Sequence, residues 1–287
     1  MSALPSFDLG GCRVRVISGG GLKLDGGAMF GIIPKALWSR KTPSDEANRI
    51  ALACNCLLVE FDGAAGRRVV IETGHGQKFD AKESRIYEID PAHWLLSSLH
   101  AINVEPTTIS DVIVTHLHFD HAGGLTMNGA GGHATPTFPQ ATVHVQRHEF
   151  DDARKNFGIM HATYREENFA PIDAANRWRL LEGEGPILPG IEALRTPGHT
   201  RGHQSILIRG RDRALIFAGD VIPTRAHAGP PYNMAYDLFP LDNRDSKRRV
   251  LQMLHERSGV LLLGHEPQTP ALRVEQDGDW WRLEPSE

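Results

Sequence analysis

Residues 115–124, Thr-His-Leu-His-Phe-Asp-His-Ala-Gly-Gly, place four side chains that can bind a metal ion within six positions. They are His116, His118, Asp120 and His121. Imidazole nitrogens and carboxylate oxygens are the ligands of hydrolytic zinc sites. A short apolar run, Asp111–Val114, precedes them and is predicted to be a strand. The stretch therefore indicates a metal-binding loop at the end of a strand, with a polar loop of hydrogen-bonded histidines as the alternative.

Three more candidate ligands each come after a predicted strand and directly after a glycine. They are His199 after Ile191–Arg195, Asp220 after Ala214–Phe217, and His265 after Val260–Leu263. Glycine lets the backbone turn sharply at the end of a strand, and side chains on such loops are held by a rigid scaffold. Each of the three alone is typical of a simple turn. Together with the first four they make seven ligands, the number that suits two metals sharing a bridging carboxylate.

The order His116-x-His118-x-Asp120-His121, then His199, Asp220 and His265, resembles the ligand pattern of the metallo-β-lactamase superfamily. The resemblance implies an α/β fold, a four-layer αββα sandwich of two mixed sheets flanked by helices, with a dinuclear site at one edge. It implies that the first metal is held by His116, His118 and His199. It implies that the second is held by Asp120, His121 and His265, with Asp220 as the bridge. Two zinc ions are expected, although manganese, iron and cobalt use similar ligands.

One position departs from the superfamily pattern. Members commonly carry an aspartate before Thr-Gly in the strand motif that precedes the ligand loop, whereas this chain has Glu72 before Thr73-Gly74. The extra methylene changes the reach of the side chain but keeps the carboxylate acceptor. We expect Glu72 to orient the ligand loop, because carboxylates that hydrogen-bond to metal ligands do so.

The remaining composition is ordinary for a globular protein: 287 residues, 40% hydrophobic, 23% charged, with a net charge of −4. We expect one domain over residues 1–287. No dense Lys/Arg run is present, so neither nucleic acid nor a membrane is an expected partner. No secretory signal and no membrane-spanning run is recognisable, so a cytoplasmic location is expected. Cys12, Cys54 and Cys56 give no disulfide framework and are expected to be buried apolar residues.

Hydrophobic patterning predicts strands in both halves of the chain, with helices between them. Beyond the four strands above, strands are expected at Arg13–Ser18, Asn55–Phe61, Arg68–Glu72, Thr142–Gln146, Trp178–Glu182 and Gln204–Ile208. Helices are expected from the N-cap Asp90 to about Ile102, from about Arg147, and over Arg244–Ser258. Asp277-Gly278 predicts a hairpin. The glycine-rich stretch Asn128–His133 is expected to be an active-site loop.

Two metals in such a site generate a hydroxide from water near neutral pH, and this hydroxide would attack the carbonyl carbon of a lactone or related ester. Asp120 would orient the nucleophile and pass its proton to the leaving group. The chain contains no Gly-x-Ser-x-Gly motif, which argues against a serine hydrolase.

Two segments are expected to border the active-site cleft. Residues 22–38 are apolar and loop-like, and Met29, Phe30, Ile33 and Trp38 line either the cleft entrance or the core. Residues 223–237 follow Asp220. Both segments resemble a subgroup related to N-acyl homoserine lactone lactonases, of which some relatives hydrolyse organophosphate triesters. Such lactonases often place a tyrosine three residues after the bridging aspartate, where this chain has Pro223. The candidate substitutes are His227, Tyr232 and Tyr236, the first two as catalytic groups and the last as a substrate contact.

Other functions share this ligand pattern. A glyoxalase II-like thioesterase would carry a helical extension for glutathione, whereas only residues 266–287 follow His265. A persulfide dioxygenase would hold a single iron with the first ligand set. A β-lactamase would carry an export signal, and a non-catalytic sensor would not need all seven ligands. The apolar segment 27–38 is also a possible contact in a homodimer.

Overall fold

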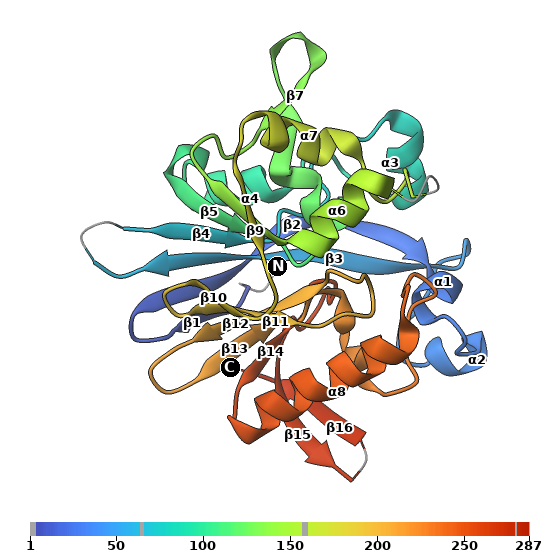
Figure 1. The fold of residues 1–287 in the computed structure, drawn as a ribbon. Coiled ribbons are helices and arrows are strands. Elements are labelled where there is room, and N and C mark those ends of the chain that lie inside the picture. Colours follow the sequence, from blue (N-terminus) through green and yellow to red (C-terminus); the bar gives the residue numbers. More distant parts are fainter. Residues whose placement is uncertain (1–3, 64–65, 157–159, 279, 287) are drawn as a thin grey trace. The chain divides into compact units, whose positions relative to one another are not determined.

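The computed structural model describes residues 4–63, 66–156, 160–278 and 280–286 (Figure 1). The chain divides into two compact units. Unit 1 comprises residues 1–21 and 53–182, and unit 2 comprises residues 22–52 and 183–287. Two seven-stranded sheets and their helices make up most of the two units, which is the mixed α/β composition expected from the sequence. That residues 1–287 form one domain stays a prediction.

The first sheet has the strand order β1-β2-β3-β4-β5-β8-β9. Its strands are β1 (Ser6–Asp8), β2 (Cys12–Asp25), β3 (Arg49–Phe61), β4 (Arg68–Ile71), β5 (Ile109–Ile113), β8 (Thr142–Gln146) and β9 (Trp178–Leu181). Strands β4, β5, β8 and β9 run parallel, while β3 is antiparallel to β4. The parallel strands β4 and β5 are almost completely buried, and their last residues, Val69–Ile71 and Val112–Ile113, are apolar because both faces of the sheet are covered there.

Short helices accompany this sheet in unit 1. They are α3 (Ala81–Tyr87), α4 (Leu95–Ala101), α5 (Phe119–Ala122), α6 (Arg147–Lys155) and α7 (Glu166–Ala174). The ribbon β6 (Thr126–Asn128) and β7 (Ala134–Pro136) pairs antiparallel and contacts α7. The core of the unit packs residues of α4, including Leu95 and Leu99, against strand residues such as Val112 and Val143.

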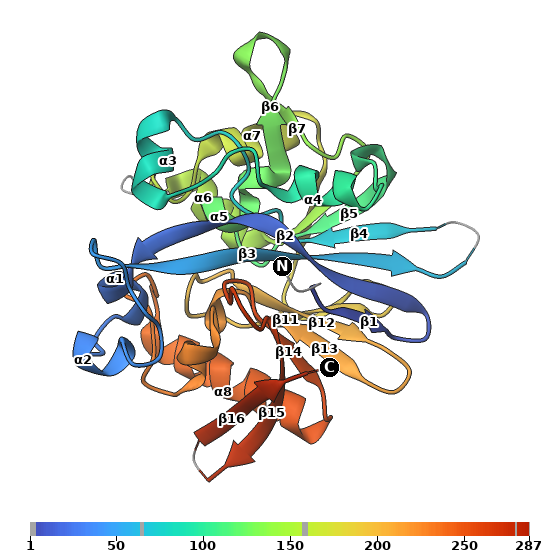
Figure 2. The same ribbon diagram turned by 180° about the vertical axis from the view of Figure 1, so that it is seen from behind.

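The second sheet has the order β10-β11-β12-β13-β14-β15-β16 and lies in unit 2 (Figure 2). Its strands are β10 (Gly185–Leu188), β11 (Ile191–Arg195), β12 (Gln204–Arg209), β13 (Ala214–Phe217), β14 (Val260–Leu262), β15 (Ala271–Asp277) and β16 (Trp280–Pro285). Among the described strands of this sheet, β13 and β14 pair parallel and the other neighbours pair antiparallel. Helix α8 (Pro240–Glu256) packs Val250, Leu251 and Leu254 on this sheet. None of the helices in the described parts of the chain has the length and apolar character needed to cross a membrane.

The structure corrects several predicted boundaries. Strand β2 continues through Gly19-Gly20-Gly21. The sequence pattern predicted that this strand ends at Ser18, because glycine is a poor strand former. Helix α4 begins at Leu95, since the Asp90 carboxylate instead caps a turn through the backbone N–H of Ala92. Helix α8 begins four residues earlier than predicted, with Pro240 at its first position.

Two segments predicted as loops contain regular structure. Residues 22–38 comprise the end of β2, helix α1 (Gly26–Phe30) and helix α2 (Lys35–Trp38). The glycine-rich stretch 128–133 is the tip of the β6–β7 ribbon. The three cysteines are buried, as expected.

Candidate metal centre

The first group of candidate ligands lies in unit 1, directly after β5. His116 and His118 stand in the loop, and α5 carries Asp120 and His121. The ring of His116 has its centroid 4.5 Å from that of His118 and 4.1 Å from that of His121. The Nε2 of His121 is 3.8 Å from Oδ1 of Asp120. All four side chains are buried. We refer to these four residues as the unit 1 ligand loop.

Glu72 holds the unit 1 ligand loop from two sides. The backbone N–H of Thr115 donates to its Oε1 at 2.6 Å, and Nδ1 of His121 lies 2.9 Å from its Oε2. The Thr73 hydroxyl donates to the carbonyl oxygen of His121 at 2.7 Å. Glu72 has a φ of 66°, which a non-glycine residue adopts only at a cost that its surroundings must offset. The glutamate thus makes the contact with the ligand loop that the sequence predicts.

A second buried carboxylate, Glu149 of α6, also holds this loop and was not predicted. Its Oε1 accepts from the backbone N–H of Leu117 at 3.0 Å and from the hydroxyl of Tyr164 at 2.9 Å. The Tyr164 ring packs 4.9 Å from the ring of His118. Burial, with the Glu149 carboxylate beside it, raises the pKa of Tyr164 far above its usual value, so the hydroxyl stays a donor. No local spacing links these residues, because they lie 32 and 15 positions from their partners.

The second group of candidate ligands lies in unit 2, on three different loops. His199 follows β11, Asp220 follows β13, and His265 follows β14. The two oxygens of Asp220 face different histidines: Oδ2 is 3.4 Å from Nε2 of His199, and Oδ1 is 3.1 Å from Nε2 of His265. All three side chains are buried.

Two polar residues that the sequence did not single out position this group. Nδ1 of His199 lies 3.0 Å from Oδ1 of Asp237, whose Oδ2 accepts from the backbone N–H of Met234 at 3.0 Å. The backbone N–H of Asp220 donates to Nε2 of His203 at 3.0 Å. Because Nε2 of His203 accepts, its Nδ1 carries the proton and donates to the carbonyl oxygen of Thr196 at 3.0 Å. His203 shares the Gly-His spacing that identified His199, whereas Asp237 has no local signature.

Both groups have donor atoms of a type and spacing that suit a metal ion such as zinc. Ligand atoms about 2.0–2.1 Å from a tetrahedral ion lie about 3.4 Å from one another. Within each unit, neighbouring ligand atoms are 3.1 to 3.8 Å apart. The Nδ1 atoms of His116, His121 and His199 are engaged by Thr115, Glu72 and Asp237. These hydrogen bonds leave Nε2 as the atom that could bind a metal ion, an arrangement that is common for metal-bound histidines.

His227 is a buried structural residue, which corrects the catalytic role predicted for it. Its Nε2 donates to the carbonyl oxygen of Met29 at 2.8 Å, and its Nδ1 lies 2.8 Å from the Thr224 hydroxyl. Burial lowers the pKa of His227 to about 4, so the ring is neutral near pH 7. Both nitrogens are therefore occupied, and the side chain is completely buried.

The apolar residues predicted at the cleft entrance separate into two sets. Met29, Phe30 and Trp38 are at most 1% exposed. The Phe30 ring stacks between His227 at 4.7 Å and Trp38 at 5.1 Å, with Tyr232 at its edge. These three are core residues of unit 2, which was the alternative reading of the sequence. Ile33 and Tyr232 are partly exposed, and Tyr236 is 40% exposed.

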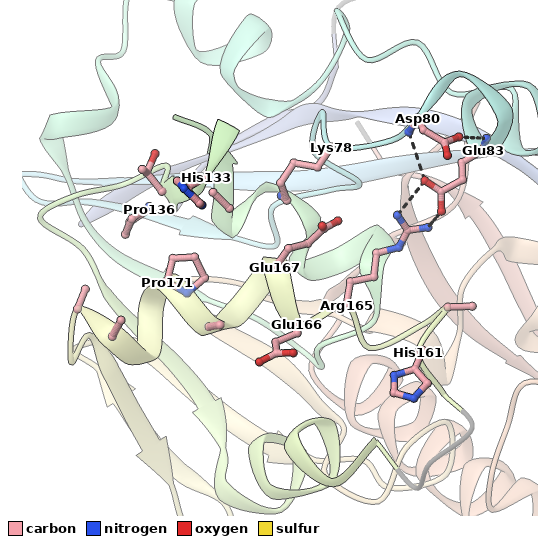
Figure 3. A pocket seen from close by; sticks show the side chains of 16 residues that line it. Lys78, Asp80, Glu83, His133, Pro136, His161, Arg165, Glu166, Glu167 and Pro171 are labelled. Carbon is pink, nitrogen blue, oxygen red and sulfur yellow. Dashed lines mark hydrogen bonds and ion pairs between the residues drawn. The ribbon is translucent and has the colours of Figure 1, made fainter. Parts of the chain in front are cut away.

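Unit 1 also contains a cavity of about 1150 Å³ beside α7 (Figure 3). Several of its charged side chains have protein partners. Lys78 donates to the carbonyl oxygens of Gly123 and Thr126, and the Arg165 guanidinium pairs with Glu83. Burial lowers the pKa of Lys78 to about 8. None of the candidate metal ligands lines this cavity.

Residues 49–265 match the sequence model of the metallo-β-lactamase superfamily. An N-acyl homoserine lactonase from a Bacillus species is 36% identical over 178 residues, covering 60% of this chain and 62% of the relative. Another, from Bacillus thuringiensis subsp. kurstaki, is 34% identical with the same coverage. The chain spans 42–62% of the length of the curated lactonases it matches first.

Two solved structures show the same fold. A crystal structure of a "probable metal-dependent hydrolase" from Staphylococcus aureus is 30% identical, with a TM-score of 0.86 over 98% of this chain and 100% of that one. AidC, described as a dizinc quorum-quenching lactonase in complex with a product, has a TM-score of 0.78 at 17% identity, over 99% of this chain and 98% of its own.

Proposed function

We propose that this chain, which belongs to the metallo-β-lactamase superfamily, is a metal-dependent hydrolase that opens a lactone or a related ester. The observation that carries the proposal is the arrangement of Asp220, whose two oxygens each face a different histidine. A carboxylate placed in this way is suited to bridge two metal ions. The resemblance of the ligand order to the superfamily, together with lactonase relatives at 34–36% identity, supports the assignment.

The proposal assigns each ligand a metal. One metal would be held by His116, His118 and His199. The other would be held by Asp120, His121 and His265, and Asp220 would be shared by the two. Nitrogen and carboxylate oxygen donors suit zinc, so two zinc ions are the proposed complement. When bound, the two ions supply a hydroxide nucleophile at neutral pH and polarise the substrate carbonyl.

The residues of the chain contribute orientation and proton transfer. Asp120 is 8% exposed, the largest exposure among the seven candidate ligands. We assign it the role of orienting the attacking water and delivering a proton to the leaving oxygen. Pro223 stands where lactonases of this subgroup place a tyrosine. Tyr232 comes later in the same segment and is partly exposed. Tyr232 is therefore the residue we propose to contact the substrate carbonyl in its place.

The substrate proposed is a lactone with an apolar arm. Tyr236 is 40% exposed and adjoins Asp237, the partner of the candidate ligand His199. Of the four residues predicted to line the entrance from segment 22–38, Ile33 is the one that is partly exposed. These two are the proposed contacts of the arm, while Met29, Phe30 and Trp38 are buried in the core of unit 2.

A hydrolysis panel on zinc-loaded protein, with metal analysis, tests the proposal. The panel includes acyl homoserine lactones, γ- and δ-lactones, S-lactoylglutathione, nitrocefin and paraoxon. We expect about two zinc ions per chain and the highest kcat/KM on a lactone. Preference for S-lactoylglutathione would favour the thioesterase instead. One iron per chain with oxygen consumption on a persulfide would overturn the hydrolase assignment.

A further inference from the structure

The loop that carries His199 is held by the segment just before helix α8. The backbone N–H of Leu238 donates to the carbonyl oxygen of His199 at 3.1 Å, and that of Phe239 donates to the carbonyl oxygen of Gly198 at 2.8 Å. Asp237, the residue directly before Leu238, adds a side-chain contact: its Oδ1 lies 3.0 Å from Nδ1 of His199. Backbone and side chain of residues 237–239 therefore fix both the position and the rotation of this imidazole.

Helix α8 itself packs against the same loop. The hydroxyl of Ser246 donates to the carbonyl oxygen of Pro197 at 2.7 Å. Gly198 has a φ of +144°, and a Cβ there would lie 2.3 Å from the Cα of Asn243. The contact is close enough that only glycine fits. The first two turns of α8 thus pack directly against Gly198, the residue before the candidate ligand His199.

Lys247 is an ammonium group buried in this region, at 2% exposure. Its Nζ donates to the carbonyl oxygen of Tyr232 at 2.8 Å and to that of Gly229 at 3.3 Å. Burial lowers its pKa to about 7, so keeping an ammonium here is costly unless the charge is compensated. The nearby Asp237 carboxylate acts in the opposite direction and favours the charged form.

We infer that Lys247 and Asp237 are positioning residues that form one clamp on His199. Lys247 fastens the turn at residues 229–232 to α8, and that turn leads directly into the segment that presents Asp237. Asp237 then sets the rotation of the His199 ring. The inference rests on the proposed function, because it takes His199 to be a metal ligand. It adds that two residues which touch no metal determine how tightly the His199 metal is bound.

Loss of either residue has a defined consequence. Asp237→Asn keeps the shape of the side chain but removes the carboxylate that fixes the histidine tautomer. Lys247→Met keeps the apolar stem but removes both hydrogen bonds to the turn. Removal of a carboxylate that orients a metal-bound histidine typically costs about 10- to 100-fold in metal affinity. We expect an effect in this range for Asp237→Asn and a smaller one, about 3- to 10-fold, for Lys247→Met, which acts through the loop.

The test measures metal affinity rather than turnover. Zinc affinity by competition with a chromophoric chelator and the visible spectrum of the Co²⁺-substituted protein are recorded for wild type and both variants. Arg248→Met is the matched control, because Arg248 neighbours Lys247 on α8 but is exposed and pairs with the exposed Asp245. The inference predicts weaker binding and an altered Co²⁺ spectrum for both clamp variants and a wild-type result for the control.

Two outcomes separate the clamp from the proposed function. If His199→Ala weakens metal binding but both clamp variants bind metal as wild type does, the clamp is wrong and the metal site stands. If His199→Ala itself retains wild-type affinity, the ligand assignment is wrong. Circular dichroism of the metal-free proteins establishes folding, and should Lys247→Met not fold, the near-isosteric Asp237→Asn decides the matter alone.

Discussion

The two units present their candidate ligands in contrasting ways. Unit 1 concentrates four of them in one loop of six residues, and two carboxylates from distant positions, Glu72 and Glu149, hold that loop by its backbone. Unit 2 supplies three ligands from three loops that are 21 and 45 positions apart in the sequence. A local sequence motif thus specifies one group, whereas strand pairing assembles the other.

Sheet topology explains how unit 2 brings its ligands together. Strands β13 and β14 are parallel neighbours, with Phe217 opposite Leu262, so the loops carrying Asp220 and His265 leave from the same edge. Strand β11 has the same direction as β13, because β12 lies antiparallel to both. The loop that carries His199 therefore leaves from that edge too. Substitutions in unit 2 should consequently disturb the scaffold more than substitutions in the unit 1 ligand loop.

The largest effects on metal content and kcat/KM are expected when one candidate ligand is removed from each unit. Asp220→Ala removes the proposed bridge and should lose both metal ions, whereas His118→Ala should lose one. Both variants should lower kcat/KM by at least about 1,000-fold, which corresponds to about 4 kcal/mol of transition-state stabilisation. Metal content by elemental analysis and steady-state kinetics measure this. Full turnover with metal retained in either variant would show that the ligand assignment is wrong.

The second comparison concerns glycine in the unit 2 scaffold. Gly198→Ala adds a methyl that meets the backbone of Asn243, at a φ that only glycine adopts readily. Strain and overpacking together should lower the free energy of unfolding by about 3–5 kcal/mol. Gly11→Ala is the control, since nothing lies within 4 Å of its added methyl. Urea denaturation of both variants gives the answer, and equal midpoints would contradict the close packing of the His199 loop.

The third prediction is a pH dependence that arises in unit 2. The pKa of His227 is about 4 in the folded protein, against an ordinary value of 6.5. Between these values the unfolded chain binds a proton that the folded chain does not, so stability falls as the pH is lowered from 6.5 to 4. Wild type should lose about 3 kcal/mol more than His227→Gln over this range. Parallel stability curves for the two proteins would refute the buried neutral state of His227.

The fourth comparison tests how the unit 1 loop is held. Glu72→Gln replaces the acceptor of Thr115 and His121 by an amide and should weaken metal binding by about 10- to 100-fold. Glu72→Asp keeps the charge but shortens the reach by one methylene, so an intermediate loss is expected. Chelator competition measures both variants. If Glu72→Asp binds metal as wild type does, the extra methylene has no role in this loop.

The smallest expected effect concerns the substrate. Tyr236→Ala should raise KM for a long-chain acyl lactone by about 3- to 10-fold, because the loss of one apolar contact costs about 1 kcal/mol. KM for a short-chain lactone should change less. Steady-state kinetics on a chain-length series measures the difference. An equal rise for short and long chains would exclude Tyr236 from the contact with the apolar arm.

Local patterns predicted much of the scaffold. Strands β8, β11 and β13 have the predicted bounds, because the alternating pattern of β8 and the short apolar runs of β11 and β13 can be recognised directly in the sequence. The seven candidate ligands were likewise identified from residue type and from their place after predicted strands. Strand β2 was shortened in the prediction, because its glycines carry no strand signal even though Gly20 packs against His75.

The sequence by itself determined the family and the set of candidate ligands, since a metal site needs particular side chains and leaves a recognisable order. Only the tertiary structure decided what holds those ligands. Asp237 is 38 positions from His199, and Glu149 is 32 positions from Leu117. The burial of Phe30 between Trp38 and His227 likewise depends on a contact across nearly 200 residues. Hydrogen bonds and packing of this kind follow from the path of the backbone in space, which local periodicity does not encode.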